Sequence, residues 1–322
     1  MTRALESSSE LDGMAGCLAT DMRRISAPDQ VFVTRIARES ADTDFHRLLE
    51  TVAPERAAAC RHMVIKINLC DYRLAETGAT TDPALLAALV RQLRKLNPAV
   101  RITVLENDAS SVEADSLFSL LGFREVARAL DIELHNASRH PWVKRDLPGG
   151  IVFRQLEIPA VVEEADFFIN FAKLKTNAIS KTTGCLKNLF ALLRPKRKSV
   201  YHGILAECIA DINMAVRSDL CIVDGLIGMG GLGGPAFGVP HKRGLLLGGL
   251  NPVSADACCA RIMGFRPRSV EHLRVSARRR LGTLRYRLAT DIPGFRYKDH
   301  KFEFSRWQYL LRCLLRGSAG VE

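Results

Sequence analysis

The chain alternates between short apolar runs and amphipathic stretches along most of its length. Several runs are rich in β-branched and other apolar residues and are bounded by polar residues or glycine, which is typical of buried strands. These predicted strands cover residues 62–70, 100–105, 166–171, 220–223 and 244–248. Two weaker runs, 132–134 and 152–156, predict a short strand and an edge strand.

Helical periodicity fills the intervals between these runs. Asp82 and Pro83 predict a helix start, because Asp accepts from free amide groups and Pro fits the first turn. Apolar positions then recur at helical spacing as far as Leu96. Further helices are predicted over residues 111–122, 183–193, 205–216 and 252–263. This alternation predicts an α/β fold, with a mostly parallel open sheet and helices on both of its faces.

The two ends of the chain differ from this pattern. Residues 1–28 are polar and serine-rich and are expected to be flexible, and residues 29–275 are expected to form the α/β domain. Residues 276–322 are predicted to be a basic helical extension that adds no strand to the sheet, because arginines are frequent from residue 266 onward. Within it, Trp307, Leu310, Leu311 and Leu314 fall on one helical face among arginines. That helix is expected either to contact an anionic membrane through residues 303–322 or to pack on the domain.

Charge narrows the class of partner. The formal net charge is +11 over 322 residues, which favours anionic partners. A nucleic-acid partner is not expected, because no known binding motif is present and aromatic residues make up only 7% of the chain. No secretory signal or membrane-spanning run is recognisable, so a cytoplasmic location is expected, with peripheral membrane contact as the variant.

Polar residues follow every clearly predicted strand. In a parallel sheet, ligands bind outside the carboxyl ends of the strands, so these residues are expected to meet at one rim. They are Asn68 after the first strand, Glu106, Asn107 and Asp108 after the second, Lys173 and Lys175 after the third, Asp224 after the fourth and Asn251 after the fifth.

The densest chemistry lies in the segment LKTNAISKTTGCLKN, residues 174–188. Lysines, hydroxyl groups and a glycine at a predicted helix start together favour an anion, since the free amide groups and the helix dipole attract negative charge. The alternative is a solvated basic loop. The residues expected to bind the anion here are Lys173, Lys175, Thr182, Thr183, Gly184, Lys187 and Asn188.

A second segment, IVDGLIGMGGLGGPAFG at residues 222–238, contains seven glycines. Glycine at this density indicates either close backbone approach to a ligand or a lid that closes over the site. Gly225, Gly234 and Gly238 are therefore expected ligand contacts, and the alternative is a long irregular loop.

Two aspartates complete the expected site. Asp224 follows a strand and Asp256 lies near the start of a small apolar helix. Together they are expected to act as a base or to hold a divalent cation, and Lys175 is the third expected catalytic residue. For Asp256, simple complementarity to the helix dipole is the alternative.

Four motifs in this order, FFINFAKLKT, TTGCLKNLF, CIVDGLIGMGGLGGPAFG and NPVSADACCARIMG, resemble the domain-of-unknown-function family 362. The resemblance spans roughly residues 60–275, and it implies the same fold and site. The family's signatures fall on Lys173, Lys175, Thr183, Gly184, Lys187 and Asn188, then on Asp224, Gly225, Gly234, Pro235 and Gly238, and then on Asp256.

Two departures from the family pattern bear on chemistry. Asn177 stands where the family commonly has a histidine, so a mechanism that uses an imidazole there is not expected, because asparagine can hydrogen-bond but cannot titrate. Some relatives carry iron–sulfur modules with clustered cysteines, whereas this chain has no such cluster. A redox protein with a cysteine-ligated metal centre is therefore the less favoured alternative, with Cys70, Cys185, Cys258 and Cys259 as its ligands.

The leading hypothesis is an enzyme that acts on a small anionic metabolite bearing phosphate or carboxylate. Lysines of residues 173–187 would neutralise the anion, and an aspartate or a divalent cation would do the chemistry. A module that only binds an anionic membrane surface is the third hypothesis.

Overall fold

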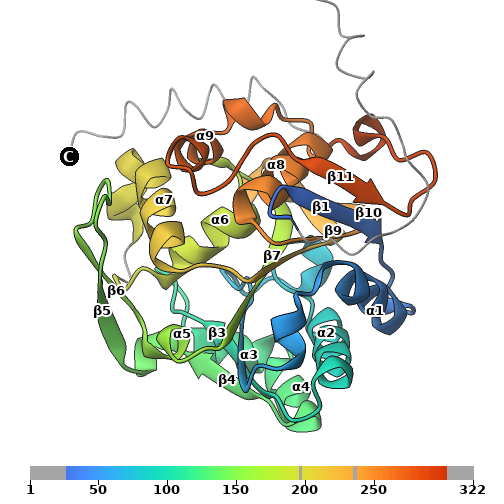
Figure 1. Cartoon of the computed structure of the whole chain (residues 1–322), viewed down its shortest axis with the longest axis horizontal. Coiled ribbons are helices and arrows are strands. Elements are labelled where there is room, and N and C mark those ends of the chain that lie inside the picture. Colours follow the sequence, from blue (N-terminus) through green and yellow to red (C-terminus); the bar gives the residue numbers. More distant parts are fainter. Residues whose placement is uncertain (1–26, 196–197, 235–237, 303–322) are drawn as a thin grey trace, which may run out of the picture.

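The computed structural model describes residues 27–195, 198–234 and 238–302. Their main feature is a nine-stranded sheet with the order β11-β1-β10-β9-β7-β2-β3-β4, in which β8 pairs with β7 (Figure 1). Its strands are β1 (Gln30–Arg35), β2 (His62–Lys66), β3 (Arg101–Glu106), β4 (Glu133–Asn136), β7 (Phe167–Asn177), β8 (Lys181–Thr182), β9 (Leu220–Gly234), β10 (Gly238–Gly249) and β11 (Arg287–Thr290). A separate antiparallel pair consists of β5 (Trp142–Asp146) and β6 (Gln155–Pro159).

Helices cover both faces of the sheet. Figure 1 shows α1, α2 and α4 grouped on one side of the strands and α6 to α9 on the other. The helices are α1 (Ala41–Val52), α2 (Pro83–Leu96), α3 (Ala114–Leu120), α4 (Phe123–Leu130), α5 (Ala160–Glu163), α6 (Gly184–Asn188), α7 (Leu205–Ala215), α8 (Pro252–Ile262) and α9 (Glu271–Arg278). Short 3₁₀ turns are η1 (Glu55–Ala58), η2 (Ala75–Thr77), η3 (Ala137–Arg139), η4 (Leu189–Leu192), η5 (Lys198–Ile204), η6 (Pro267–Ser269) and η7 (Tyr297–His300).

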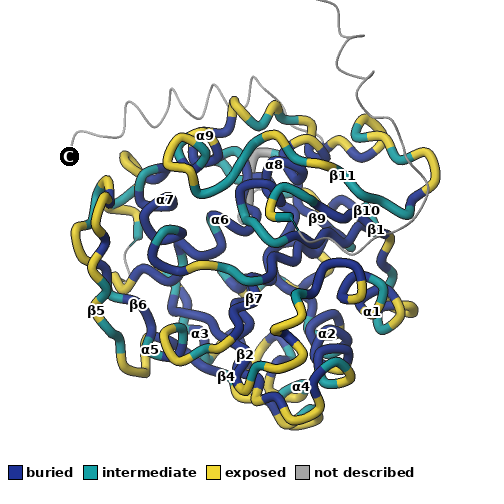
Figure 2. Tube along the Cα trace, viewed as in Figure 1, coloured by how far each residue is buried: buried dark blue, intermediate teal, exposed yellow. Residues whose placement is uncertain are grey.

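The alternation of side chains along the central strands explains this layering. In β2, Ile65 packs into the cluster under α1 to α4, while its neighbour Val64 packs into the cluster on the opposite face. In β7, Phe167 packs into the first of these clusters and Phe168 into the second, because successive side chains point to opposite faces of the sheet. Figure 2 shows the central strands buried throughout, with exposed residues confined to the periphery. The predicted α/β fold with a mostly parallel sheet is confirmed.

Strand order creates a switch point between β2 and β7. From β2 the chain steps through β3 to β4 in one direction, with each pair parallel. It then returns to the other side of β2, where β7 pairs in parallel, and continues to β9. At such a reversal the loops that leave neighbouring strands diverge to opposite faces, and a crevice opens at the carboxyl ends of the strands.

The glycine-rich segment is not a lid, and that expectation is wrong. Residues 220–234 form β9, which pairs antiparallel with β10. The backbone groups are thus satisfied by strand pairing, and the glycines fit where side chains have no room. A Cβ at Gly228 would lie 2.5 Å from the ring of Phe302, and one at Gly225 would lie 2.9 Å from the Leu245 carbonyl oxygen.

Both ends of the described chain add strands that the sequence pattern missed. Strand β1 pairs with β10 on one side and with β11 on the other, so residues 287–290 extend the sheet. The expectation that the chain beyond residue 275 adds no strand is therefore wrong, because an exposed edge of β1 accepts a short strand despite its arginine. The predicted basic helix of residues 303–322 lies outside the described residues.

Other boundaries shift locally. The helix expected over residues 183–193 divides into α6 and the 3₁₀ turn η4. The edge strand expected near residue 152 begins at Gln155 and pairs with β5 outside the main sheet. The start of α2 is as predicted, since the Asp82 carboxylate accepts from the Ala84 amide at 2.9 Å. Among the described residues, no helix has the length and apolar character needed to cross a membrane.

Candidate functional site

A cavity of about 190 Å³ opens at the switch point, at the carboxyl ends of β2, β3 and β7. Its walls come from the loops after these strands, from α6 and η4, and from η5. The side chains that bear on its chemistry are those of Lys66, Asn68, Cys70, Glu106, Asp108, Lys175, Asn177, Thr183, Lys187, Asn188 and Lys198. We call this space the lysine cavity.

The deepest lysine of the cavity is neutralised by the chain itself. Lys66 Nζ lies 2.6 Å from Glu106 Oε1, and both side chains are fully buried. The other carboxylate oxygen, Glu106 Oε2, accepts from the Leu69 amide at 2.6 Å. Burial lowers the pKa of Lys66, and the ion pair with Glu106 opposes that effect. Because ion pair and hydrogen bonds occupy both groups, they form the floor of the cavity and leave no free charge there.

Lys175 has no carboxylate partner within the described part of the chain. Its ammonium donates to Asn68 Oδ1 at 2.6 Å, to the Ala79 carbonyl oxygen at 2.8 Å and to Cys70 Sγ at 3.3 Å. Three neutral acceptors hold the head group in place but leave its positive charge uncompensated.

Two further lysines of the cavity, Lys187 and Lys198, have pKa values well below the usual lysine value. Burial lowers the pKa of Lys187 to about 8, and the charge of Lys175 acts in the same direction. Burial also lowers the pKa of Lys198 to about 8. The Lys198 ammonium donates to the backbone oxygen of Asp108 at 3.0 Å, whereas Lys187 lies over the ring of Phe190, 5.8 Å from its centroid. Both therefore respond strongly to a nearby anion.

A chain of asparagines fixes the wall between β2 and α6. Asn68 Nδ2 donates to Asn188 Oδ1 at 2.8 Å, and Asn188 Nδ2 donates to Asn170 Oδ1 at 2.9 Å. Asn170 Nδ2 in turn donates to the Cys185 carbonyl oxygen at 2.9 Å. Such a satisfied network sets the orientation of the Asn68 amide, so its oxygen faces Lys175.

Thr183 brings an unused hydroxyl to the cavity wall. Its side chain is 3% exposed, and its Oγ1 has no hydrogen-bond partner among the described residues. Thr182 Oγ1 is buried and unpartnered in the same way. Because buried hydroxyls normally find partners, an unpaired one in the wall of a cavity marks a place for a ligand atom or water.

The amide groups at the start of α6, expected to receive an anion, already hold one that belongs to the chain. Asp256 Oδ1 accepts from the Cys185 amide at 2.6 Å, and Oδ2 accepts from the Leu186 amide at 2.8 Å. Gly184 has a φ of +61°, and a Cβ there would lie 2.2 Å from the carboxylate. Burial raises the pKa of Asp256 to about 7. Gly184 thus makes room for Asp256.

Asp224 also has an internal partner. Its Oδ2 lies 2.8 Å from Lys173 Nζ, and both residues are buried. Its Oδ1 accepts from the Leu226 amide at 3.0 Å. Burial raises the pKa of Asp224, while Lys173 acts to lower it. Neither Asp224 nor Asp256 is among the residues lining the lysine cavity.

The structure therefore brings together only part of the predicted site. Among the described residues, the cavity collects Asn68, Lys175, Thr183, Lys187 and Asn188, whereas the other predicted contacts lie elsewhere. Those placed elsewhere are Lys173, Thr182, Gly184, Asp224, Gly225, Gly234, Gly238 and Asp256.

No metal centre is preformed in the part of the chain that the structure describes, where no group of three or more His, Cys, Asp or Glu side chains is placed to hold an ion. Cys70 lies beside Lys175, while Cys185 contacts Cys221 and Cys259. The four cysteines of the redox alternative are therefore not gathered at one point, and the residues present do not fit an iron–sulfur cluster.

Sequence reasoning left two lysines of the cavity out. Lys66 has a signal, because a charged residue inside the apolar run VIKINL must be paired when the strand is buried. Lys198 lies in the basic run PKRKS, where nothing distinguishes it from a solvated residue.

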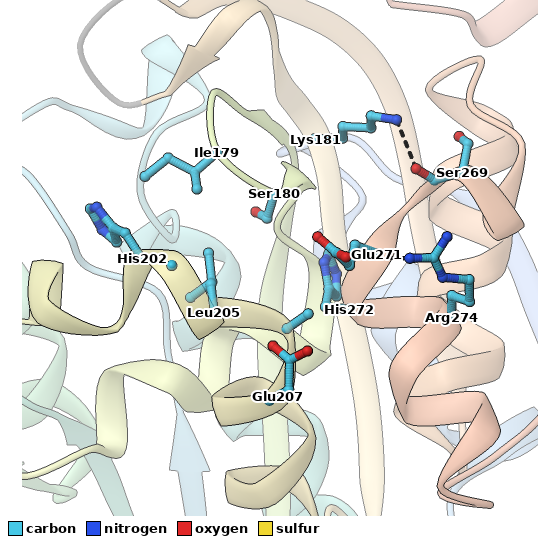
Figure 3. A pocket seen from close by; sticks show the side chains of 12 residues that line it. Ile179, Ser180, Lys181, His202, Leu205, Glu207, Ser269, Glu271, His272 and Arg274 are labelled. Atoms are coloured by element: carbon cyan, nitrogen blue, oxygen red, sulfur yellow. Dashed lines mark hydrogen bonds and ion pairs between the residues drawn. The ribbon is translucent and has the colours of Figure 1, made fainter. Parts of the chain in front are cut away.

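A second pocket, of about 320 Å³, lies between the turn after β7, the start of α7 and α9 (Figure 3). Figure 3 shows His272 and Glu271 of α9 facing Glu207 of α7, with Lys181 donating to the Ser269 carbonyl oxygen at 2.7 Å. Burial lowers the pKa of His272 to about 3, so its imidazole is neutral. Acidic and basic residues are mixed in this pocket, so it does not select for an anion.

The chain is similar to one protein family, to a curated protein and to a solved structure. The family described as "Domain of unknown function (DUF362)" matches residues 63–261, more than half of the chain. The thylakoid-associated protein sll1697 of Synechocystis is 29% identical over 137 residues, which are 40% of this chain and 42% of that protein. The lactate racemase apoprotein of Thermoanaerobacterium thermosaccharolyticum is 14% identical with a TM-score of 0.43, covering 76% of this chain and 58% of that one. The chain thus spans about half the length of these two proteins.

Proposed function

The chain belongs to the DUF362 family, and from that premise we propose that it is an enzyme acting on a small anionic metabolite held in the lysine cavity. One observation carries the proposal. Lys66 is matched by Glu106, but Lys175 and Lys187 have no carboxylate partner among the described residues. Enclosed and uncompensated ammonium groups are costly unless a ligand brings the opposite charge, so the cavity favours a carboxylate or phosphate group.

The ligand's anionic group would lie among the lysine head groups at the switch point. Lys175 is held by neutral acceptors, so it can strengthen its interaction with an incoming anion without breaking an ion pair. The Thr183 hydroxyl would donate to a further oxygen of the ligand. Charge-assisted hydrogen bonds of this kind are short and directional, and they would fix the metabolite in one orientation.

Lys187 is the proposed acid–base group. With a pKa of about 8, a useful fraction of its amine is neutral at physiological pH. The neutral amine would take a proton from the carbon beside the anionic group, and Lys175 would stabilise the negative charge that develops on oxygen. In this proposal Lys187 takes the role expected of Asp224 and Asp256, since both aspartates are engaged elsewhere.

The test is a thermal-shift and calorimetric screen of the purified chain against phosphate, sulfate and small carboxylates. We expect at least one anion to raise the unfolding temperature, because a ligand that binds only the folded state stabilises it by mass action. Lys187→Gln should lower the affinity for that anion about tenfold or more, because it removes one positive charge from the cavity. Lys144→Gln, which changes an exposed lysine of β5 outside the cavity, is the matched control. Equal binding by all three proteins would refute the proposal.

We also propose that residues 303–322 attach the protein to anionic membranes, because Arg306, Arg312 and Arg316 lie among apolar residues that recur at helical spacing, such as Trp307 and Leu310. The name of the curated relative, a thylakoid-associated protein, is consistent with a membrane-peripheral location. Removal of residues 303–322 should abolish sedimentation with phosphatidylserine vesicles while leaving phosphate binding unchanged. Unaltered sedimentation would rule this attachment out.

A further inference from the structure

Cys70 occupies a distinctive place in the lysine cavity. It lies in the loop after β2, at the switch point, and its thiol is half-buried and lines the cavity. Its Sγ accepts a hydrogen bond from Lys175 Nζ at 3.3 Å. Most other described cysteines are fully buried, and only Cys60 has comparable exposure within the described ranges. Cys70 is therefore both reachable and in contact with a cation.

Three ammonium groups bear on this sulfur. Besides Lys175, the lysines Lys66 and Lys187 line the same cavity as Cys70. Ammonium groups around a thiol attract anionic electrophiles, and they stabilise the negative charge that moves to oxygen when the sulfur attacks a carbonyl carbon. The arrangement is that of a nucleophile, because a purely structural thiol needs no cations around it.

Cys60 provides the internal contrast. It is also half-buried, and its Sγ donates to the Ala57 carbonyl oxygen at 3.4 Å, as the Cys70 Sγ does to the Ala79 carbonyl oxygen at 3.9 Å. Burial raises the pKa of Cys60, and the negative charge of Asp166 adds to that rise. The chain thus holds two thiols of similar exposure: lysines line the cavity around Cys70, whereas Asp166 and Arg56, which have opposite charges, lie near Cys60.

A second feature of the same cavity supports a ligand next to Cys70. The Thr183 hydroxyl is buried, lines the same cavity and has no partner among the described residues. A substrate oxygen that accepts from Thr183 or from a lysine would hold an adjacent carbon within the cavity that the sulfur faces.

We propose that Cys70 is the nucleophile of the lysine cavity and adds to the carbonyl carbon of an anionic oxo compound. This inference rests on the proposed function of the same cavity. The Sγ–C bond forms as the carbonyl π pair moves to oxygen. The neutral amine of Lys187 takes the thiol proton and returns it to that oxygen, so S–H adds across C=O to give a hemithioacetal. No atom is lost and no oxidant or reductant is consumed.

The test measures alkylation of each cysteine in the full-length chain, using iodoacetamide and its anionic counterpart iodoacetate, with site-resolved mass spectrometry. At neutral pH we expect Cys70 to react about tenfold or more faster than Cys60, because lysines line the cavity around Cys70, whereas burial raises the pKa of the Cys60 thiol. The ratio of the alkylation rate with iodoacetate to that with iodoacetamide should be higher at Cys70 than at Cys60, since the cavity attracts the carboxylate of iodoacetate. Lys175→Met should slow alkylation of Cys70, and Lys175→Arg, which keeps the charge, should restore it.

The inference is overturned if Cys70 in the unaltered chain reacts no faster than Cys60, a comparison that needs no variant to fold. It is also overturned if a folded Lys175→Met protein alkylates Cys70 at the unaltered rate. Phosphate titration of Cys70→Ser separates this inference from the proposed function. Phosphate binding together with an unreactive Cys70 in the unaltered chain removes the nucleophile alone, and a reactive Cys70 without binding of any anion removes the proposed function and with it the anionic substrate of this inference.

Discussion

Lys173 and Lys175 lie two residues apart on β7, yet the structure treats their charges in opposite ways. Lys173 is buried against Asp224 at 2.8 Å, and the pair is closed to ligands. Lys175 faces the lysine cavity, where an amide oxygen, a carbonyl oxygen and a thiol surround it. The same residue type on the same strand is thus part of the framework in one place and a candidate ligand contact in the other.

The difference shows that a buried charge must be judged by its partner. Where the chain supplies the counter-charge, as Asp224 does for Lys173 and Asp256 does for the start of α6, the group stabilises the fold. Where the chain leaves the charge unmatched, the missing partner is sought outside the protein. Predictions that remove or add a partner test this distinction directly.

The largest expected effect is on the matched pair. Asp224→Ala leaves Lys173 buried without a counter-charge and should lower the free energy of unfolding by about 3–5 kcal/mol. Urea denaturation measures it. The double change Lys173→Met with Asp224→Leu, which removes both charges, should recover most of the loss. A single-variant loss below about 1 kcal/mol would show that the pair is not structurally required.

Asp256 should show a smaller loss of the same kind. Asp256→Asn keeps one acceptor for the Cys185 and Leu186 amides but places an NH₂ group opposite the other. An unsatisfied buried amide costs about 1–3 kcal/mol, which urea denaturation should detect as a fall in unfolding free energy. Unchanged stability would mean that water replaces the lost acceptor. Phosphate affinity of the folded variant should stay unaltered, because Asp256 does not line the cavity.

Adding a partner to the cavity should weaken anion binding. The Asn177 Oδ1 accepts from the Ile179 and Ser180 amides, and an aspartate oxygen can accept the same bonds. Asn177→Asp therefore keeps the turn while placing a negative charge at the cavity wall, and sulfate affinity should fall about tenfold, or about 1.4 kcal/mol. Calorimetric titration measures it, with the exposed substitution Lys144→Gln as the control. Full retention of affinity would place the anion elsewhere.

The smallest expected effect is a pH dependence. The pKa of Lys187 and of Lys198 is about 8, so both lose charge as pH rises through that value. Sulfate, which does not titrate in this range, should bind about threefold to tenfold more weakly above pH about 9 than near pH 7. Lys187→Arg keeps its charge and should flatten the profile. An affinity that is constant with pH would show that neither lysine touches the anion.

The linkage to folding has the opposite sign. A lysine with a depressed pKa in the folded state binds its proton more weakly there than in the unfolded chain. Between pH about 8 and about 10.5 the unfolded state therefore holds more protons, and the contribution of Lys187 to stability rises with pH. Lys187→Gln should remove that rise, as chemical denaturation at two pH values would reveal.

Local patterns predicted the sheet and the location of the cavity, because strand periodicity and strand ends are written in neighbouring residues. Asn68 was found as the residue after a predicted strand, and Lys175 and Lys187 were found as lysines of the polar segment that follows the strand predicted at residues 166–171. The partners of buried charges were not predictable, because Asp256 reaches amides 70 or more positions away and Lys66 needs Glu106 from another strand. Long-range pairing also explains why β1, β11 and the glycine-rich continuation of β9 beyond residue 223 escaped prediction.

The position of β1 has a consequence for the order in which the strands pair during translation. Among the described strands β1 is translated first, but both of its neighbours, β10 and β11, come from residues 238–290. The strands β2, β3 and β4 are complete far earlier and need only one another and β7. We therefore expect the apolar side chains of β1, among them Phe32, to wait unpaired through most of synthesis, which makes this strand the one that a holding chaperone would meet.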